Sequence, residues 1–285
     1  MKKLLLLFAI VCFPAENSQK TEAYDIVYVI NLDRTPERFE KTNDQLCKSG
    51  IKCLRFSAVD GYLVKLSDQS SGEVISGKES GEKIKKYFRE KHPVLYRVTY
   101  GGKYKSAEFD LFVKYRRFSA GEIGVTYSHR AIWADVVKNN RQNVVVFEDD
   151  VILSENFKKD LEELIHNIPE DADITFIGVG RRPDKRISYP NIDNIFRNFD
   201  HVPGNDVVAK IQPTNFVYGM YAYIVSAKGA KKLLELTNRS EYQVDDIIFQ
   251  QGGINKGIIK AYVAKKKMCY PDCTNSEIRK MGRSF

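Results

Sequence analysis

A strand, a helix and a second strand follow one another directly near the start of the chain, and this alternation most constrains the fold. Residues 24–32 (YDIVYVINL) are β-branched and aromatic, which is typical of a buried strand. Thr35 as N-cap and Pro36 in the first turn begin a helix that Gly50 ends. Residues 51–58 then read as a second strand. Parallel strands need such a crossover, so the pattern predicts an α/β fold with a mainly parallel central sheet.

A later strand over residues 143–147 (NVVVF) is strongly apolar and runs directly into Glu148, Asp149 and Asp150. Ligands of open α/β sheets bind outside the carboxyl ends of strands. Strand alternation sends Glu148 and Asp150 to one side and Asp149 to the other. Adjacent carboxylates repel, and a hard cation such as Mn²⁺ or Mg²⁺ would compensate their charge. We therefore expect a metal bound by Asp150 with help from Glu148; a solvated acidic turn is the alternative.

Further elements follow in an α/β order. Ser119 and Glu122 form a capping box that predicts a helix over 120–138, and His129 lies on this helix. A lone histidine on a helix is either a hydrogen-bonded core residue or a functional one. The remaining expected elements are a helix over 156–167, strands over 173–179 and 221–225, a helix over 227–237 started by Ser226, and a strand over 257–263.

A second acidic pair, Asp245-Asp246, follows Val244 and begins a short helix. Carboxylates beside so much apolar sequence face a cleft or cap a helix. One of them is therefore a candidate general base, and a helix cap is the alternative.

The segment between residues 64 and 115 carries weaker signals. Residues 67–81 are rich in serine, glycine and charge and predict a loop, while 82–91 predict a basic helix. Residues 94–115 mix aromatics with lysines. We interpret residues 64–115 as a variable insertion across one side of the core.

The N-terminus has the layout of an export signal. Lys2 and Lys3 precede an apolar run over 4–13 that is too short to span a bilayer. Residues 1–23 are therefore expected to be a signal peptide or an N-terminal membrane-associating segment, followed by one domain over 24–285. The net charge of +8 suggests an anionic partner, such as phosphates, an anionic glycan, a membrane surface or nucleic acid; a solvated basic surface is the alternative. No nucleic-acid-binding motif accompanies this charge, and we expect no nucleic acid partner.

Beyond the signal, the cysteines are Cys47, Cys53, Cys269 and Cys273. In an exported protein they permit two disulfides of undetermined pairing. A zinc site is not expected, because no histidine cluster or second close cysteine pair accompanies Cys269 and Cys273.

Taken together and in this order, six blocks resemble glycosyltransferase family 25, which includes bacterial lipooligosaccharide galactosyl- and glucosyltransferases and collagen galactosyltransferases. The blocks are YVINLDRTPERFE (28–40), FSAVDG (56–61), FSAGEIGVTYSHRAIW (118–133), VVVFEDDVIL (144–153), YAYIVSAKGAKKLL (221–234) and VDDIIF (244–249). One departure is Val125-Thr126-Tyr127 before Ser128-His129, where family members often have Cys-Ala-Leu.

The resemblance implies a GT-A-like, Rossmann-type fold that binds a UDP-sugar donor with Mn²⁺ (or Mg²⁺). It carries the metal and donor motif onto Glu148, Asp149 and Asp150. It carries the later acidic site onto Asp245 and Asp246, one of which is the candidate catalytic base. It carries the first donor loop onto Asn31, Asp33, Arg34 and Arg38, and His129 is a further expected donor-binding residue.

The expected function is that of a metal-dependent inverting glycosyltransferase. It would move a hexose, galactose or glucose, from the UDP-sugar to a hydroxyl of a lipopolysaccharide or lipooligosaccharide glycan or of a glycoprotein. A non-catalytic glycan or nucleotide-sugar binding protein with the same fold is the alternative. The expected location is the secretory pathway or a membrane surface through peripheral contact, on the cytosolic face of the inner membrane if the protein is bacterial.

Overall fold

A computed structural model describes residues 23–90, 92–114, 117–178, 199–212, 219–251 and 253–272. Residues 1–22 of the predicted signal or membrane-associating segment and Cys273 lie outside them. None of the helices in these ranges is both long and apolar enough to cross a membrane. The helices are α1 (Pro36–Lys48), η1 (Gly61–Leu63), α2 (Gly77–Glu90), η2 (Lys105–Ala107), α3 (Ala120–Lys138), α4 (Phe157–His166), α6 (Ala227–Leu236), α7 (Val244–Asp246) and η3 (Ile247–Gln251).

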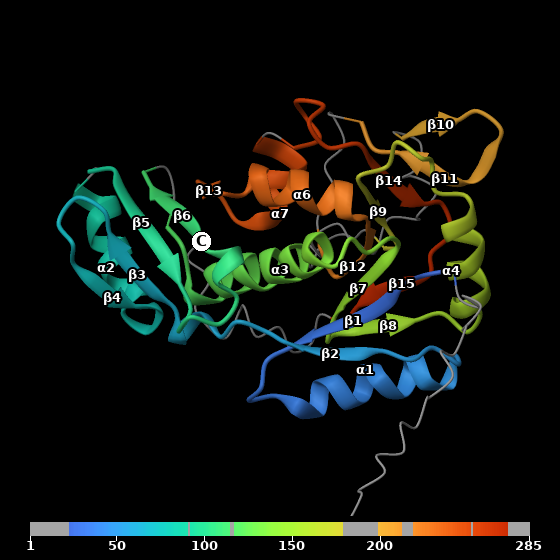
Figure 1. Cartoon of the computed structure of the whole chain (residues 1–285), viewed down its shortest axis with the longest axis horizontal. Coiled ribbons are helices and arrows are strands. Elements are labelled where there is room, and N and C mark those ends of the chain that lie inside the picture. Colours follow the sequence, from blue (N-terminus) through green and yellow to red (C-terminus); the bar gives the residue numbers. More distant parts are fainter. Residues whose placement is uncertain are drawn as a thin grey trace, which may run out of the picture.

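The described strands form a large sheet and two smaller ones (Figure 1). The large, eight-stranded sheet has the order β10-β11-β14-β9-β12-β7-β1-β2, and its strands are β1 (Ile26–Asn31), β2 (Leu54–Ser57), β7 (Val144–Glu148), β9 (Ile174–Phe176), β10 (Asp200–Val202), β11 (Asn205–Lys210), β12 (Ala222–Val225) and β14 (Ala261–Ala264). Strands β2, β1 and β7 are parallel, as predicted. Strand β12 runs antiparallel to both its neighbours, so the α/β fold is confirmed but its complete sheet is mixed.

Helices cover both faces of the large sheet. Along β7, Val145 and Phe147 pack on the face that α1 and α4 cover. Val144 and Val146 point to the opposite face, against α3 and α6. This alternation is the period of two that a strand buried on both faces requires. It continues past Phe147 and decides where the following carboxylates point.

The segment over 64–115 supplies most of the strands of a separate sheet. The five-stranded sheet has the order β13-β6-β5-β3-β4, with strands β3 (Lys65–Asp68), β4 (Val74–Ser76), β5 (Val94–Thr99), β6 (Phe109–Val113) and β13 (Arg239–Ser240). The loop predicted over 67–81 is therefore wrong, because β4 and the start of α2 fall within it. The polar side chains that suggested a loop belong to an antiparallel hairpin, in which exposed positions alternate with the buried Leu66 and Ile75.

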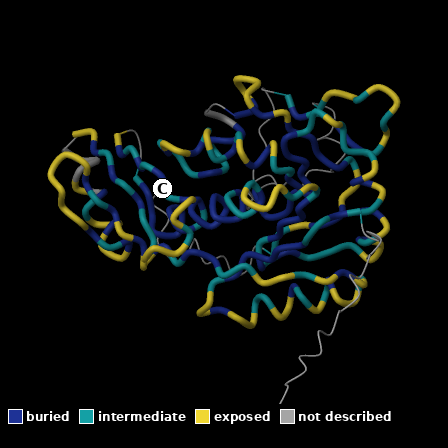
Figure 2. Tube along the Cα trace, viewed as in Figure 1, coloured by how far each residue is buried: buried dark blue, intermediate teal, exposed yellow. Residues whose placement is uncertain are grey.

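Helix α3 joins the two sheets. Its Ile132 and Trp133 belong to the core of the large sheet, whereas Ile123 and Tyr127 pack into the core of the five-stranded sheet. Figure 2 shows this helix as buried over most of its length. A helix buried on both sides holds its side chains in fixed rotamers, so residues on α3 can position a site.

The helix starts test the capping predictions. Ser119 accepts from the Glu122 amide and Glu122 accepts from the Ser119 amide, so the capping box is confirmed. Ser226 likewise accepts from the amide of Gly229. Thr35 precedes α1 with Pro36 in the first turn, as predicted, but its side chain makes no capping hydrogen bond and turns back toward the carbonyl of Leu32 at 3.4 Å.

The start of α3 lies in direct backbone contact with the turn that η1 forms. A Cβ atom on Gly61 would lie 1.7 Å from the carbonyl oxygen of Ala120, and one on Gly124 would lie 2.7 Å from that of Val59. Gly124 therefore allows the backbone of α3 to pack closely on the loop after β2. This contact fixes the position of the loop after β2.

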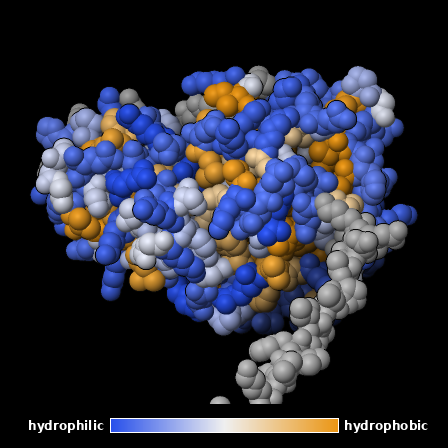
Figure 3. Space-filling model, viewed as in Figure 1, coloured by the Kyte–Doolittle hydropathy of each residue, from blue (hydrophilic) through white to orange (hydrophobic). Residues whose placement is uncertain are grey.

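The surface in Figure 3 is mostly hydrophilic, with separate small hydrophobic patches. The two-stranded sheet pairs β8 (Val151–Leu153) with β15 (Cys269–Pro271). Cys47, Cys53 and Cys269 are free thiols. No disulfide therefore joins these three, and any bond to Cys273 lies outside the described residues.

Candidate active site

A pocket opens at the carboxyl ends of β1 and β7, beside the first turns of α3. It brings together the end of the first strand, the loop after β2 and the acidic triplet. Its lining residues are Ile30, Leu32, Arg38, Ala58, Val59, Gly61, Gly121, Val125, Ser128, His129, Glu148, Asp149 and Asp150. The pocket therefore lies at the carboxyl ends of the strands, where the sequence predicted a ligand-binding site.

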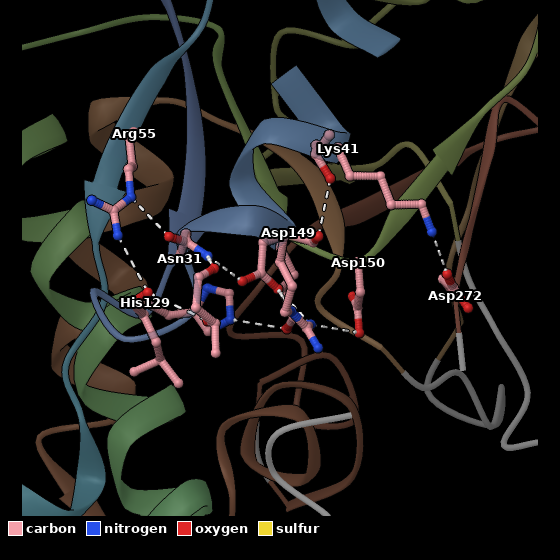
Figure 4. A network of polar contacts seen from close by, with 12 residues as sticks. Asn31, Lys41, Arg55, His129, Asp149, Asp150 and Asp272 are labelled. Carbon is pink, nitrogen blue, oxygen red and sulfur yellow. Dashed lines mark hydrogen bonds and ion pairs between the residues drawn. The ribbon is translucent and has the colours of Figure 1, made fainter. Parts of the chain in front are cut away.

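Asp149 is held by the N-terminal strand and helix (Figure 4). Arg38 donates to its Oδ1 from Nε at 2.9 Å, and Asn31 donates to its Oδ2 from Nδ2 at 2.6 Å. The hydroxyl of Thr42 donates to its backbone carbonyl at 3.0 Å. Asp149 thus points to the α1 side, as the alternation predicted, and its charge is compensated within the protein. Two of the predicted donor-binding residues, Asn31 and Arg38, therefore use part of their hydrogen-bonding capacity to hold Asp149.

A further arginine that the sequence did not point to, Arg55, lies beside the loop after β1. Arg55, on β2, donates from Nε to Oδ1 of Asn31 at 2.7 Å and lies 3.3 Å from Asp33. Arg34 pairs with Asp60 at 3.0 Å and is 40% exposed. Arg34 and Asp33 therefore lie at the outer rim, and Arg55 holds the amide that orients Asp149. Its position in the strand that pairs in parallel with β1 was the available signal.

At the pocket, Asp150 has a carboxylate oxygen with no hydrogen-bond partner among the described residues. Its Oδ1 is buried and has no hydrogen-bond partner among the described residues, while its Oδ2 lies 3.3 Å from Arg38. Burial and the charge of Glu148 raise the pKa of Asp150 to about 7, against the opposing effect of Arg38. The backbone amide of Asp272 donates to the Asp150 carbonyl, and Lys41 pairs with the Asp272 side chain at 2.7 Å (Figure 4).

The residues fit a divalent cation in part. No group of three or more histidine, cysteine or acidic side chains is arranged to hold a metal in the described part of the chain. However, an unpartnered buried carboxylate oxygen on Asp150, next to Glu148, is the ligand chemistry that Mn²⁺ and Mg²⁺ prefer. Two carboxylates make an incomplete set, which such ions commonly complete with phosphate oxygens and water.

His129 is fully buried in the wall of the pocket at 1% exposure. Its Nδ1 lies 3.0 Å from the hydroxyl of Tyr223, and the indole of Trp133 donates to the same hydroxyl at 3.1 Å. Its Nε2 lies 3.6 Å from Oε1 of Glu148. Burial lowers the pKa of His129 to about 4, although the charge of Asp245 works against this shift. The imidazole is therefore neutral at physiological pH, and it joins α3 to β12 while its Nε2 faces the end of β7.

Asp245 and Asp246 lie in the first turn of α7, where Gln243 is the N-cap. Oδ2 of Asp245 accepts from the Gly219 amide at 3.1 Å. Burial, followed by the charge of Glu148, raises the pKa of Asp245 to about 6, and His129 opposes this shift. The fold thus brings Asp245 into electrostatic contact with Glu148 and His129. The catalytic roles of Asp245 and Asp246 stay predictions.

Two further residues at the site, Trp133 and Tyr223, were missed in the sequence. Trp133 follows His129 by one helical turn, so both lie on one face of α3. Tyr223 lies in β12, which pairs with β7. The helical spacing could have identified Trp133, but the contact with Tyr223 depends on which strand lies beside β7.

Residues 24–248 match the model of the family described as glycosyltransferase family 25 (LPS biosynthesis protein). The match covers most of the chain and includes every candidate site residue. The chain therefore belongs to glycosyltransferase family 25, and the GT-A-like fold that the sequence predicted is confirmed.

Individual relatives are similar over the same part of the chain. Human procollagen galactosyltransferase 2 is 26% identical over 220 residues, which cover 74% of this chain and 27% of the relative. The glycosyltransferase 25 family member of Drosophila melanogaster is 27% identical over 210 residues, 74% of this chain and 28% of the relative. The human inactive glycosyltransferase 25 family member 3 is 28% identical over 217 residues, which cover 74% of this chain and 29% of the relative. The chain thus spans less than a third of the length of these relatives.

Proposed function

We propose that this chain is a metal-dependent glycosyltransferase that moves a hexose, galactose or glucose, from a UDP-sugar to an acceptor hydroxyl with inversion. The observation that carries the proposal is the buried acidic group at the pocket, in which Asp150 has an unpartnered oxygen beside Glu148. Neighbouring buried carboxylates raise one another's pKa, and a bound cation would favour their ionised forms. Family membership supports the nucleotide-sugar donor.

Glu148 and Asp150 would hold Mn²⁺ or Mg²⁺ together with the donor diphosphate. When bound, the ion would neutralise the charge that develops on the departing UDP. Arg34, exposed at the rim beside Asp33, is the candidate contact for the nucleotide. Arg38 supports the acidic group from the α1 side, where it pairs with Asp149 and Asp150.

Asp245 is the preferred general base, with Asp246 as the second candidate. A pKa of about 6 leaves Asp245 ionised at neutral pH and still basic enough to accept a proton from the acceptor hydroxyl. As the hydroxyl oxygen bonds to the anomeric carbon, its proton passes to the carboxylate. The bond from that carbon to the diphosphate oxygen breaks, and its electrons leave with UDP.

The acceptor is proposed to be a glycan or a glycoprotein. The family description names lipopolysaccharide biosynthesis, and relatives are named procollagen galactosyltransferases. We propose that acceptor choice depends on residues 64–115, which supply most of the five-stranded sheet. Action in the secretory pathway, or at a membrane surface on the cytosolic side in a bacterium, remains part of the proposal and rests on residues 1–23.

The test measures UDP release from UDP-galactose and UDP-glucose with glycan and glycoprotein acceptors, with and without Mn²⁺. We expect metal-dependent transfer that Asp150→Asn and Asp245→Asn each reduce by about 10²-fold or more. Asp206→Asn, which removes a 99% exposed carboxylate, is the matched control and should leave activity unchanged. Full activity of Asp150→Asn, or transfer that survives metal removal, contradicts the mechanism.

A non-catalytic binding protein is the second candidate, because relatives such as the human family member 3 are named inactive. Under this alternative, the chain binds UDP or a UDP-sugar but releases no UDP with any acceptor. Calorimetric binding without turnover would favour it over the transferase.

A further inference from the structure

Three buried side chains meet behind the pocket wall. His129 and Trp133 come from α3, and Tyr223 comes from β12 on the sheet beneath it. The Tyr223 hydroxyl lies 3.0 Å from Nδ1 of His129 and 3.1 Å from Nε1 of Trp133. All three side chains are buried at 1% exposure or less. In Figure 4 the imidazole lies beside the network of Asn31 and Asp149.

Counting protons at this junction determines the tautomer of His129. The indole N–H can only donate, so the Tyr223 hydroxyl accepts from Trp133. The hydroxyl has a single proton, and Nδ1 of His129 is its one acceptor within hydrogen-bond reach among the described residues. We assign Nδ1 as the unprotonated acceptor, because a proton there would leave the buried Tyr223 proton without an acceptor, while a proton on Nε2 faces the Glu148 carboxylate. The imidazole proton consequently lies on Nε2.

The Nε2 proton faces the acidic group. Nε2 lies 3.6 Å from Oε1 of Glu148 and has no hydrogen-bond partner among the described residues. A separation of 3.6 Å is slightly longer than a hydrogen bond, and such contacts often shorten when a ligand closes the site. An unpartnered donor that is fully buried and directed at the pocket is costly unless it serves a ligand or a ligand-binding carboxylate.

We propose that Trp133 and Tyr223 are positioning residues that hold His129 as an Nε2–H donor to Glu148. The donated hydrogen bond directs Glu148 into the pocket, where it assists Asp150. The chain of contacts thus runs from Trp133 through Tyr223 and His129 to Glu148. The catalytic consequence rests on the proposed function, but the proton position does not.

The primary test is the ¹⁵N NMR spectrum of the imidazole nitrogens in the full chain. The protein has four histidines, so His129→Gln identifies the His129 signals by their loss. We expect a protonated Nε2 and an unprotonated Nδ1 in the unsubstituted protein. Tyr223→Phe should shift these signals toward a mixture of both tautomers. Tyr28→Phe is the matched control, because it removes a tyrosine hydroxyl that donates to Asp135 on the same helix at 2.8 Å.

The second readout is kinetic. Loss of a partner that orients a ligand-binding residue typically reduces activity by about 10- to 100-fold. Tyr223→Phe should therefore lower kcat by this factor with little change in the KM of the donor, and Tyr28→Phe should not. His129→Gln, whose side-chain amide can still donate toward Glu148, should retain more activity than His129→Leu.

Protonated Nδ1 in the unsubstituted protein would overturn the proposal, and so would a Tyr223→Phe spectrum identical to the original. Equal activity of His129→Gln and His129→Leu would overturn the role of the donated hydrogen bond. If no donor is turned over, the proposed function fails while the NMR result still decides the tautomer. In that case the affinity for UDP and Mn²⁺, compared between Tyr223→Phe and Tyr28→Phe, replaces kcat.

Discussion

Arg38 donates to one oxygen of Asp149 from both Nε and Nη2, and this pair ties helix α1 to the end of β7. The same guanidinium reaches Asp150 at 3.3 Å with a less direct contact. Neighbouring carboxylates therefore have different partners, and Asp149 is the structural member of the triplet. Asp150 is the member with capacity left for a ligand.

This difference in partners predicts that Asp149→Asn and Asp150→Asn affect stability differently. Asp149→Asn leaves Arg38 without its main charge partner at a site where both side chains are at most 16% exposed, so it should lower the free energy of unfolding by about 3 kcal/mol. Asp150→Asn removes a carboxylate that burial and Glu148 disfavour, so it should leave stability unchanged or raise it. Urea unfolding of both variants without metal tests this contrast. Equal losses in the two variants would contradict it.

The raised pKa of Asp245 predicts a pH-dependent stability. Between about pH 4 and pH 6 the folded protein retains a proton that the unfolded chain loses, so the contribution of Asp245 is present at low pH and disappears as the pH rises through about 6. His129, whose pKa is lowered to about 4, changes stability in the opposite direction over this range.

We therefore expect the unfolding free energy of the unsubstituted protein, relative to Asp245→Asn, to fall by up to about 3 kcal/mol between about pH 4 and pH 7. Denaturant unfolding of both proteins over this range measures the difference. A difference that is constant with pH would show that the pKa of Asp245 is not raised.

The contact between η1 and α3 predicts that Gly61 cannot be replaced by a larger residue without loss of stability. Gly61→Ala forces a Cβ atom to within 1.7 Å of the Ala120 carbonyl, so the turn must move away, with an expected loss of about 3 kcal/mol or more. Gly81→Ala is the control, since a Cβ atom there meets nothing within 4 Å and Gly81 lies in helix α2. It should stabilise by about 0.5–1 kcal/mol. Thermal unfolding of both variants measures the contrast.

Arg130, next to His129 in the sequence, is expected to have a structural role. Its buried guanidinium donates to the carbonyls of Ala107, Glu108 and Leu234, and so connects α3 and the five-stranded sheet to α6. Arg130→Met leaves these acceptors unpaired and should cost about 3 kcal/mol or more. Arg239→Met, at a 54% exposed side chain, should change stability by less than about 1 kcal/mol. Chemical denaturation compares the two, and equal small effects would contradict the bridging role.

Much of the site was predictable because its signals are local. The apolar run before Glu148 predicted a buried strand, and strand alternation correctly sent Asp149 away from Glu148. The capping box at Ser119 predicted the start of α3 at the residue where the structure has it. The five-stranded sheet escaped prediction, because hairpins with polar faces resemble loops when their pairing partners are unknown.

The sequence by itself determined the elements that carry the site, the place of the acidic triplet at a strand end and the family, because propensity, capping and alternation act over a few residues. Only the tertiary structure decided the partners. Arg38 reaches Asp149 across 111 residues of sequence, and Tyr223 reaches His129 across 94. Burial and charge at such contacts determine which carboxylate is neutralised and which nitrogen carries a proton. Those properties depend on what the fold packs around each group, and a local pattern does not contain them.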